Sequence, residues 1–500
     1  MWCSDSNKSA SWAARSARPA CGSGSAQVVS VGCREGVSLM TDERKVLERV
    51  LQEATGFLDG LNGRRVAART DVDGVAAALR RPLPEDGAEP LKVVEELIAG
   101  AEPGIVAVPS GRFFGWVIGG VLPATLAADW LTSTWDQNAG LLASSPAAAG
   151  AEWVASEWVL DLLGLPATSA VGFVTGGMIA NFTCLAAARH EVLRRVGWNV
   201  ENDGLCNAPD VTVIVGEERH ETVDVALRFL GLGEARSIIV PADDQGRIRL
   251  DELAGTLEQV SGNPLIVCLQ AGNVHSGAFD PIADAVDLAH QHGAWVHVDG
   301  AFGLWAAASA KYQPLLTGVE RADSWATDAH KTLNVPYDSG IAIVANAAAM
   351  YAAMGVHAAY LIQDERPDPF STVPEFSRRA RGFTVWAALR SLGRRGAADM
   401  VERFCAHARR FAAGLSQMEG VRVLNDVVFT QVCVSFGTDE VTRAVAVRLL
   451  REGTAWMTPS TWHGQAVLRI SVSNWRTTEE DVDRTLEAVR RVLDEVRGSG

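Results

Sequence analysis

Short apolar runs alternate with longer amphipathic stretches between residues 123 and 385. The runs have the length of buried strands and are bounded by turn residues, whereas the stretches between them repeat apolar positions at helical spacing. We therefore expect strands at Ala170–Val174, Val211–Val215, Ser237–Val240, Leu265–Gln270, Ala294–Val298, Ser324–Thr327 and Ile341–Ala345. Helices are expected at Ala147–Leu163, Met178–Val196, Glu221–Leu230, Leu250–Gln259 and Ile282–His292. This alternation predicts an α/β domain with a mainly parallel seven-stranded sheet and crossover helices.

The pattern changes beyond about residue 385, where the predicted helices become longer and the strands fewer. We expect helices at Phe383–Leu392, Ala397–Met418, Glu440–Glu452 and Thr477–Arg497, with strands at Val421–Val423, Gln431–Phe436 and Ala466–Val472. The sequence thus predicts a large α/β domain over residues 123–385 and a small α/β C-terminal domain over residues 386–500.

The N-terminal part does not read as a complete domain. Residues 40–122 predict an N-terminal helical segment, with one helix from about residue 41 to Leu61 and another at Leu91–Ala101. Residues 1–39 are rich in Ser, Ala, Gly and Arg and lack both apolar periodicity and the continuous apolar core of a signal peptide. We expect a disordered tail there, or a start codon placed too early.

Composition narrows the classes of function. The chain has 500 residues, of which 48% are hydrophobic, and a net charge of -15, which argues against nucleic acid or an anionic membrane as a partner. No window offers the roughly 18 uninterrupted apolar residues of a membrane helix. None of the eight cysteines forms a CxxC pair, so the sequence suggests neither a metal site nor a disulfide framework, and we expect a cytoplasmic protein with reduced thiols.

A glycine-rich turn links a predicted strand to a predicted helix at Gly172–Asn181, GFVTGGMIAN. The backbone N–H groups of Gly176, Gly177 and Met178 would face an anion at the positive end of the helix dipole. The motif is not GxGxxG, and the same glycines could serve only the turn.

An amine and an acid stand at the ends of two predicted strands. The strand in WVHVDGAFGLW ends in Asp299, and Lys331 follows His330 just after the strand at Ser324–Thr327. Pyridoxal phosphate needs such a pair, because a lysine amine binds its aldehyde and a carboxylate keeps its pyridine nitrogen protonated. Taken alone, Lys331 could be a solvated surface residue, and Asp299 could cap a helix or form an ion pair within the protein.

Three further residues follow predicted strands, at the edge where open α/β sheets bind ligands. The flat ring of His220 could stack on a planar cofactor or belong to an ordinary loop. Asn273 could bind a ring substituent, and Ala301 is small enough to lie against the ring face. We expect Asp280 to be structural and to cap the helix Ile282–His292.

Together these motifs resemble pyridoxal-phosphate-dependent amino-acid decarboxylases of the group II type over about residues 105–490. The resemblance rests on TGGxxAN (Thr175–Asn181), His220, GAFDP (Gly277–Pro281), HVDGA (His297–Ala301) and HK (His330-Lys331). It implies the aspartate-aminotransferase-like fold (fold type I) and decarboxylation of an L-amino acid to an amine and CO2. It also implies a homodimer with the active site at the interface.

The resemblance also implies roles for individual residues. Lys331 matches the lysine that binds the cofactor covalently, and Asp299 matches the partner of the pyridine nitrogen. His220 matches the histidine that stacks on the ring. Residues matching phosphate-binding positions are Gly177, Met178, Asp328 and His330.

Two more residues match positions that act on the substrate. Tyr360 falls where the family has a tyrosine on a mobile loop that reprotonates Cα, and Arg469 matches an arginine that can bind a substrate carboxylate. Either could instead be structural, Tyr360 on an amphipathic surface and Arg469 in a strand ion pair.

The sequence departs from the family pattern in the phosphate loop and near the substrate. Met178 replaces the usual Ser or Thr, Ile179 replaces a frequent Glu, and the loop Val117–Gly120 lacks a polar residue that some relatives use. An aromatic set suggests an aromatic or apolar substrate, although it could simply be core: Phe113, Phe114, Trp116 and Trp135.

Other outcomes stay open on the same fold. The chain could be an aminotransferase, an aldol-type lyase or an aldehyde-forming oxidative decarboxylase, and the last is disfavoured by a Tyr at position 360, where relatives that make aldehydes often have Phe. A catalytically silent scaffold is a further possibility, against which the joint presence of Lys331 and Asp299 argues.

Overall fold

The computed structural model describes residues 39–260, 262–356 and 367–498, so residues 1–38 of the expected tail lie outside it. Its centre is a seven-stranded sheet with the order β2-β8-β7-β6-β5-β3-β4. The strands are β2 (Ala170–Val174), β3 (Thr212–Gly216), β4 (Ile238–Val240), β5 (Leu265–Gln270), β6 (Trp295–Asp299), β7 (Ser324–Asp328) and β8 (Gly340–Val344). Only β8 runs antiparallel to its neighbours, β2 and β7, which confirms the mainly parallel sheet.

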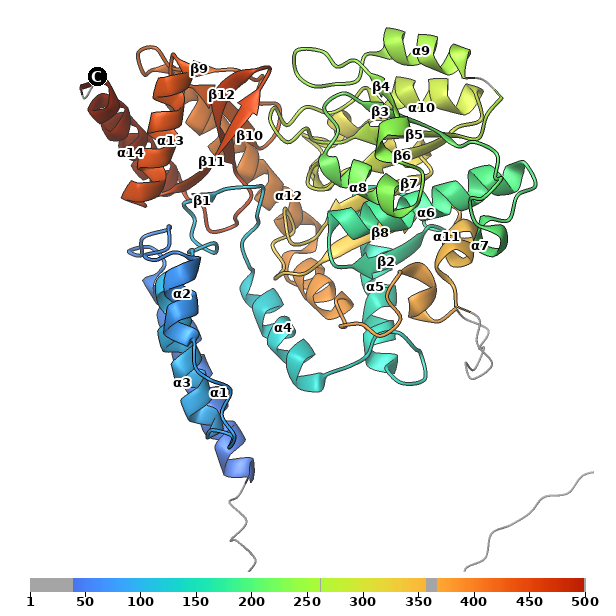
Figure 1. The fold of residues 1–500 in the computed structure, drawn as a ribbon. Coiled ribbons are helices and arrows are strands. Elements are labelled where there is room, and N and C mark those ends of the chain that lie inside the picture. Colours follow the sequence, from blue (N-terminus) through green and yellow to red (C-terminus); the bar gives the residue numbers. More distant parts are fainter. Residues whose placement is uncertain (1–38, 261, 357–366, 499–500) are drawn as a thin grey trace, which may run out of the picture.

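Helices cover both faces of this sheet, which explains why its strands are apolar along their whole length (Figure 1). One buried cluster joins the sheet to α6 (Gly177–Arg195), α8 (Glu221–Phe229) and α11 (Ala347–Met354). The other joins it to α5 (Pro146–Leu163), α9 (Leu250–Gln259), α10 (Ile282–Gln291) and α12 (Gly382–Ser416). The sheet therefore presents only its strand ends to ligands.

A second, five-stranded sheet lies beside the first, with the order β1-β11-β12-β10-β9. Its strands are β1 (Phe113–Phe114), β9 (Arg422–Val423), β10 (Gln431–Ser435), β11 (Trp456–Trp462) and β12 (Gln465–Ser471), packed against α12, α13 (Asp439–Glu452) and α14 (Glu479–Gly498). The two expected helices Phe383–Leu392 and Ala397–Met418 are the two parts of α12, which kinks at Gly393, where the backbone is not helical. The expected segment 40–122 also contributes β1 to this sheet, and the limits at residues 122 and 385 stay a prediction.

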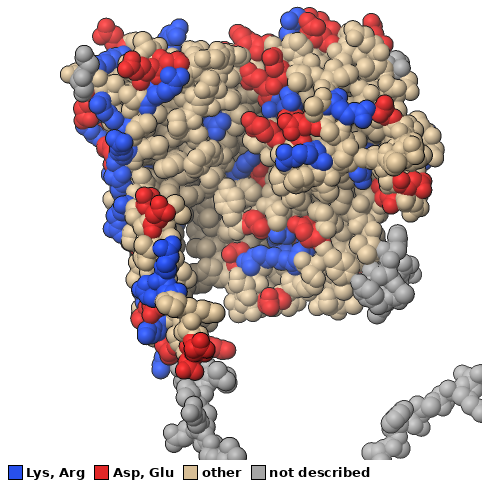
Figure 2. Space-filling model, in the orientation of Figure 1, with Lys and Arg blue, Asp and Glu red and all other residues tan. Residues whose placement is uncertain are grey.

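Three N-terminal helices form an arm that projects from the two sheets (Figure 1). They are α1 (Leu39–Gly60), α2 (Val72–Leu79) and α3 (Pro90–Ala101), and they pack mainly on one another, while α4 (Pro123–Trp135) leads back to the body. Acidic and basic side chains are intermixed on the face that Figure 2 shows. The remaining helical turns are α7 (Val200–Asp203) and η1–η6 (Glu102–Gly104, Glu234–Arg236, Gly303–Ala308, Gln313–Leu316, Val319–Arg321 and Pro369–Thr372).

Within the described parts of the chain, no helix combines the length and the apolar character needed to cross a lipid bilayer.

Candidate active site

Most of the predicted site residues meet in one cavity of about 490 Å³ at the C-terminal edge of the large sheet. The volume lies in the range of small-ligand sites. The strand ends of β2, β3, β5, β6 and β7 converge here, as the rule for open α/β sheets requires. Predicted residues that line the cavity are Trp116, Gly176, Gly177, Met178, His220, Asp299, Ala301, Asp328, His330, Lys331 and Arg469.

Asp299 is a buried acid whose two oxygens both accept hydrogen bonds. The side chain of Asn181 donates to Oδ2 at 3.1 Å, and the backbone N–H of Ala301 donates to Oδ1 at 3.2 Å. Asp299 is only 5% exposed, so these donors stabilise a charge that burial alone would disfavour. The acid is thus fixed in orientation at the end of β6.

A chain of buried hydrogen bonds supports Asn181 from behind. Its Oδ1 lies 2.9 Å from Nε2 of His297, and Nδ1 of His297 lies 3.0 Å from the hydroxyl of Ser324, to which the indole of Trp295 donates at 2.9 Å. Because the Asn181 amide donates to a carboxylate, its oxygen must accept from His297. His297 is therefore neutral and protonated on Nε2, and burial accordingly lowers its pKa to about 4.

Lys331 lies across the same cavity in an ion pair. Its Nζ is 2.9 Å from Oδ2 of Asp328, the last residue of β7. The Lys331 side chain is 19% exposed, so its amine is sheltered but reachable from the cavity. Asp299 and Lys331, which the sequence placed at two strand ends, are thus brought together in the structure.

The glycine-rich turn stands beside this pair. Helix α6 begins at Gly177, with Gly176 as N-cap and no side-chain cap, so its first N–H groups remain available for an anion. Gly340, on the neighbouring strand β8, must also be a glycine, because a Cβ at position 340 would lie 2.5 Å from the backbone of Gly176. Met178 lines the cavity at the position where the family pattern has the hydroxyl of a Ser or Thr.

His330 is held in one tautomer next to the turn. The backbone N–H of Ser339 donates to its Nδ1 at 3.1 Å, which leaves the proton on Nε2. Tyr337 stacks on the ring with centroids 4.2 Å apart. Burial lowers the pKa of His330 and Asp328 opposes this shift, so His330 contributes a neutral donor beside the glycine-rich turn.

His220 lies in the cavity wall as the N-cap of α8. The hydroxyl and the backbone N–H of Thr222 lie 2.9 and 3.2 Å from its Nδ1, which fixes the plane of the imidazole ring. Thr222 also lies 3.3 Å from the amide of Asn181, so the ring and the acid share a neighbour. His220 is thus placed where a planar ligand could reach it.

Two expectations at the next strand end are wrong in detail. The amide of Asn273 donates to Glu218 at 2.9 Å, and its oxygen accepts the N–H groups of His275 and Ser276, so it closes its own turn and does not line the cavity. Asp280 is structural, but it does not cap α10, whose N-cap is Pro281. Its carboxylate instead accepts backbone N–H groups of Ile248 and Gln270.

The small sheet supplies the opposite wall of the cavity. Arg469 of β12 is 6% exposed, and none of its nitrogens has a hydrogen-bond or ion-pair partner among the described residues. His275 lies 2.9 Å from the hydroxyl of Ser460 and stacks on Trp462. Burial and the neighbouring Arg469 lower the pKa of His275 to about 4. The wall therefore carries one buried cation that makes no ion pair with the described residues, although the carboxylate of Glu221 lies near enough to act on its pKa.

The loop before α4 closes the cavity at a third side. Trp116 lines it, is 53% exposed and has a left-handed backbone, as does Val117. A Cβ on Gly119 would lie 2.0 Å from the carbonyl oxygen of Lys331, and Gly120 donates to the side chain of Asn334 at 2.7 Å. Gly119 and Gly120 belong to the loop in which some relatives have a polar residue. The loop needs glycine at these positions because it packs closely against the segment that contains Lys331 and Asn334.

The expected aromatic lining is mostly wrong. Phe113 and Phe114 are fully buried in β1 and pack in the small-sheet region, while Trp135 lies edge-on to Phe383. Only Trp116 of the four lines the cavity, and Phe302 joins it. Phe113 and Phe114 do not reach the cavity because β1 pairs with β11, more than three hundred residues away in the sequence.

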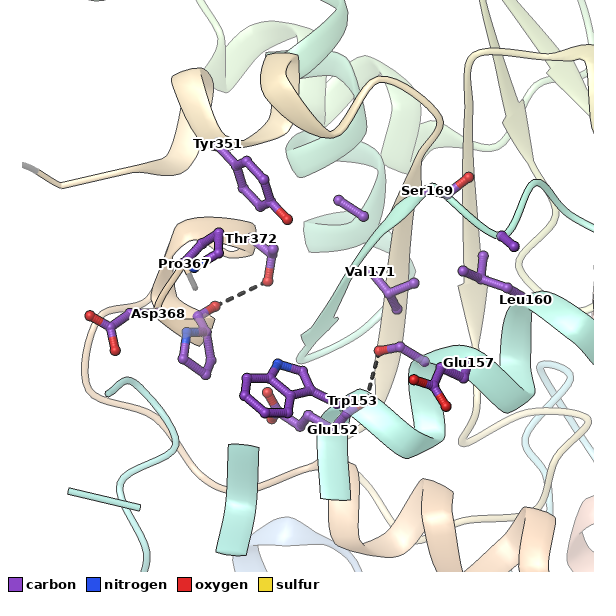
Figure 3. Close-up of a pocket in the computed structure, with 14 residues that line it drawn as sticks. Glu152, Trp153, Glu157, Leu160, Ser169, Val171, Tyr351, Pro367, Asp368 and Thr372 are labelled. Atoms are coloured by element: carbon purple, nitrogen blue, oxygen red, sulfur yellow. Dashed lines mark hydrogen bonds between the residues drawn. The ribbon is translucent and has the colours of Figure 1, made fainter. Parts of the chain in front are cut away.

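A separate cavity of about 280 Å³ lies between α5 and η6, with Tyr351 directed into it (Figure 3). Its wall includes Glu152, which forms a buried two-pronged ion pair with Arg378 at 2.6 and 2.7 Å. None of the predicted site residues lines it. Tyr360, which the resemblance placed at the active site, lies outside the described residues.

The residues in the main cavity fit pyridoxal phosphate. An amine at Lys331 and an acid at Asp299 line the same space, and uncapped N–H groups at Gly177 offer an anion site. Sequence reasoning missed Asn181, His297 and His275 as contributors. A signal was present for His297, since it precedes Asp299 by two residues in a strand and must share its face.

Comparison with known proteins agrees with this site. Residues 77–436 match the pyridoxal-dependent decarboxylase conserved domain. The chain is 25% identical to an aromatic-L-amino-acid decarboxylase of Bacillus atrophaeus over 92% of this chain and 98% of that protein. It is 26% identical to tryptophan decarboxylase 1 of Oryza sativa subsp. japonica over 81% of this chain and 84% of the relative.

Solved structures share the fold. The crystal structure of Oryza sativa TDC with PLP and tryptamine superposes with a TM-score of 0.85 at 24% identity, over 91% of this chain and 98% of that one. Mouse CSAD in apo form gives 0.82 at 22% identity, over 89% and 98%. The fold is therefore fold type I, as predicted. With its family domain over most of the chain, this protein belongs to the pyridoxal-dependent decarboxylases and is a carboxy-lyase that acts on an amino acid.

Proposed function

We propose that this enzyme converts an L-amino acid to its amine and CO2, with Lys331 and Asp299 as the pair that binds pyridoxal phosphate. The observation that carries the proposal is their convergence: an amine from β7's end and an acid from β6's end line one cavity. Neither residue alone would distinguish catalysis from structure, but together they satisfy both electronic requirements of the cofactor.

Bound pyridoxal phosphate supplies an aldehyde that takes up amines and a ring that accepts the electron pair freed when CO2 leaves. Asp299, held in place by hydrogen bonds from Asn181 and Ala301, would hold a proton at the ring nitrogen. The N–H groups of Gly177 and Met178 would bind the phosphate, and Nε2–H of His330 would add a neutral donor. The ring of His220 would bound the cofactor's face, with Ala301 small enough to lie opposite.

Arg469 and Lys331 would act on the substrate. A buried guanidinium without an ion-pair partner is well suited to bind the carboxylate of an incoming amino acid. Lys331, once its amine is free, would take up and return a proton in the sheltered cavity. Trp116, Val117 and Val274 line the remaining wall and favour an apolar or aromatic side chain. The printed name of the Bacillus atrophaeus relative, an aromatic-L-amino-acid decarboxylase, is consistent with that choice.

Tyr360 is proposed as the residue that delivers a proton to Cα after CO2 leaves. Its support is the match to the family position and the scarcity of tyrosine, with four in the chain. Tyr360→Phe should lower amine formation and raise the yield of aldehyde and H2O2. Amine formation at the full rate in this variant would remove Tyr360 from the mechanism.

The cofactor assignment is tested by reducing the holoenzyme with borohydride and mapping the adduct by mass spectrometry. We expect a pyridoxyl group on Lys331 and on no other residue. A panel of L-amino acids, with amine, CO2, aldehyde and H2O2 measured in parallel, then identifies the substrate and the reaction. An adduct elsewhere, or none, would overturn the proposed function.

We also propose a homodimer in the cytoplasm. An apolar groove of about 560 Å³ lies between α1 and α4, lined by Leu51, Phe57, Leu58, Leu126 and Trp130 among others. A second copy of the chain is the occupant that would bury this apolar groove. The cysteines within the described residues are all free, as in a reducing compartment.

A further inference from the structure

Asp328 is a buried acid with an ion-pair partner on only one of its two oxygens. It is 1% exposed, and its Oδ2 pairs with Lys331 at 2.9 Å. Its Oδ1 has no hydrogen-bond partner among the described residues, although Nε2 of His330 lies 3.6 Å away. Asp299, by contrast, has a donor on each oxygen. The charge on Asp328 therefore depends on the Lys331 amine.

The same carboxylate stands against the glycine turn that is to bind phosphate. A Cβ built on Gly177 would lie 2.9 Å from Oδ2 of Asp328, and one on Gly176 would lie 3.6 Å from Oδ1. A phosphate at the start of α6 would thus approach a second anion. Like charges at such distances repel, and the repulsion is weakly screened in a buried site.

The neighbouring groups do not cancel this charge. His330 faces Asp328 from the segment before Lys331, but burial lowers its pKa and keeps it neutral. Tyr337 is also neutral, since burial and Asp328 raise its pKa. Asp338 is paired with Arg381 at 2.8 Å and offers Asp328 no positive charge. Lys331 is left as the cation that offsets Asp328.

We propose that Asp328 opposes cofactor binding, because it pairs with the lysine amine in the cofactor-free chain and repels the phosphate at Gly176–Gly177. This deepens the proposed function and rests on it. When the amine leaves Asp328 for the cofactor, a buried carboxylate loses its partner, and that cost weakens the complex. Asp328 makes pyridoxal phosphate easier to lose, so that the loaded fraction of the enzyme follows the cofactor supply.

The test measures binding rather than turnover. Full-length, cofactor-free protein is titrated with pyridoxal phosphate and with deoxypyridoxine 5'-phosphate, which has the phosphate but no aldehyde, and tryptophan fluorescence or calorimetry gives the Kd. Asp328→Asn keeps the shape and removes the charge, and we expect it to bind both compounds about tenfold more tightly. Asp338→Asn, the same change in the same loop but paired with Arg381, should shift Kd less than about threefold.

A second variant separates the lysine pair from folding effects. Lys331→Met leaves Asp328 without a cation and should bind the aldehyde-free compound about tenfold more weakly than the parent. Adding Asp328→Asn to Lys331→Met should restore the parent Kd. Equal or weaker binding by Asp328→Asn, or no restoration in the double variant, would overturn the proposal while leaving the proposed function intact. If neither the parent nor any variant binds pyridoxal phosphate, both fall together.

Discussion

Two buried charges line the same cavity and are treated in opposite ways. Asp299 is 5% exposed and accepts a donor on each oxygen, and the Ser324 hydroxyl and the Trp295 indole continue the hydrogen-bond chain behind Asn181 and His297. Arg469 is 6% exposed, and the described residues provide no hydrogen-bond or ion-pair partner for its guanidinium. Burial lowers the pKa of Arg469, and the charge of Glu221 only partly opposes this shift.

This difference separates a permanent ligand from a transient one. A charge whose partners all belong to the chain is held in one geometry before any ligand arrives, which suits a cofactor that stays through every cycle. A buried charge without partners gains most when an opposite charge enters, which suits a substrate that must be recognised each time. The predictions below challenge this division of the cavity.

The largest effect on activity is expected for Asp299, the charge whose two oxygens already accept hydrogen bonds. Asp299→Asn keeps the shape but cannot keep a proton on the ring nitrogen, so kcat should fall about a thousandfold, as when a key electrostatic group of an active site is removed. Asp280→Asn is the matched control, because Asp280 is a buried acid at the end of β5 that accepts two backbone N–H groups. It should lower thermal stability but change kcat of the folded enzyme less than about threefold. Equal losses of kcat in both variants would contradict a special role for Asp299.

For Arg469, the charge without hydrogen-bond partners, the effect of mutation should appear in KM. Arg469→Ala should raise KM about a hundredfold, since a charge-assisted contact in a sheltered site is lost, and should change the Kd of pyridoxal phosphate less than about twofold. Arg469→Lys should recover part of the loss. Because the wild-type guanidinium is buried and unpaired, Arg469→Ala should not lower the melting temperature of the ligand-free protein. A weakened cofactor with an unchanged KM would reverse the assignment.

The half of the cavity around Asp299 could be predicted from the sequence, because its residues follow buried strands directly. Asp299, Lys331 and the glycine turn each follow a buried strand, and parallel strands bring their ends to one edge. The supporting His297 was also readable, since residues two apart in a strand share a face. The order of strands in the sheet still needed the structure.

The half of the cavity around Arg469, to which we assign the substrate, could not be predicted in the same way. Its residues come from segments that meet only through long-range pairing, such as β1 with β11 and β11 with β12. Strand β11 contains Pro459, which usually argues against a strand, so the residue pattern did not indicate β11. Phe113 and Phe114 therefore looked like pocket residues, and the missing partner of Arg469 could not be inferred from composition or spacing.

A smaller effect tests the support behind Asp299. Asn181→Ala removes one donor to the acid and the acceptor for His297, so we expect kcat to fall about tenfold, with the absorbance of bound cofactor titrating at a different pH from the parent. Asn425→Ala is the control, since Asn425 is a buried amide that binds only backbone groups near the small sheet. Both variants should lose stability, and only Asn181→Ala should change the absorbance titration. If Asn425→Ala shifts it as well, the effect is one of general packing.

The smallest effect concerns the stability of the protein in acid. Burial lowers the pKa of His297 to about 4, whereas an unfolded histidine titrates near 6.5, so between these values the unfolded chain binds a proton that the folded chain does not. Stability should therefore fall as pH falls from about 6.5 toward 4, and melting temperatures of the cofactor-free protein at successive pH values measure that slope. His297→Asn should flatten it.

His275 sharpens this last comparison, because its pKa is also lowered to about 4 while it lies beside Arg469. His275→Gln should flatten the acid slope to a similar degree, since the same linkage applies. Its effect on catalysis should differ, because His297 supports the acid and His275 contacts the substrate wall. We expect a reduced kcat with unchanged KM for His297→Asn, and a raised KM with nearly unchanged kcat for His275→Gln. Identical kinetic changes in the two variants would mean that the cavity is one coupled network rather than two differently prepared halves.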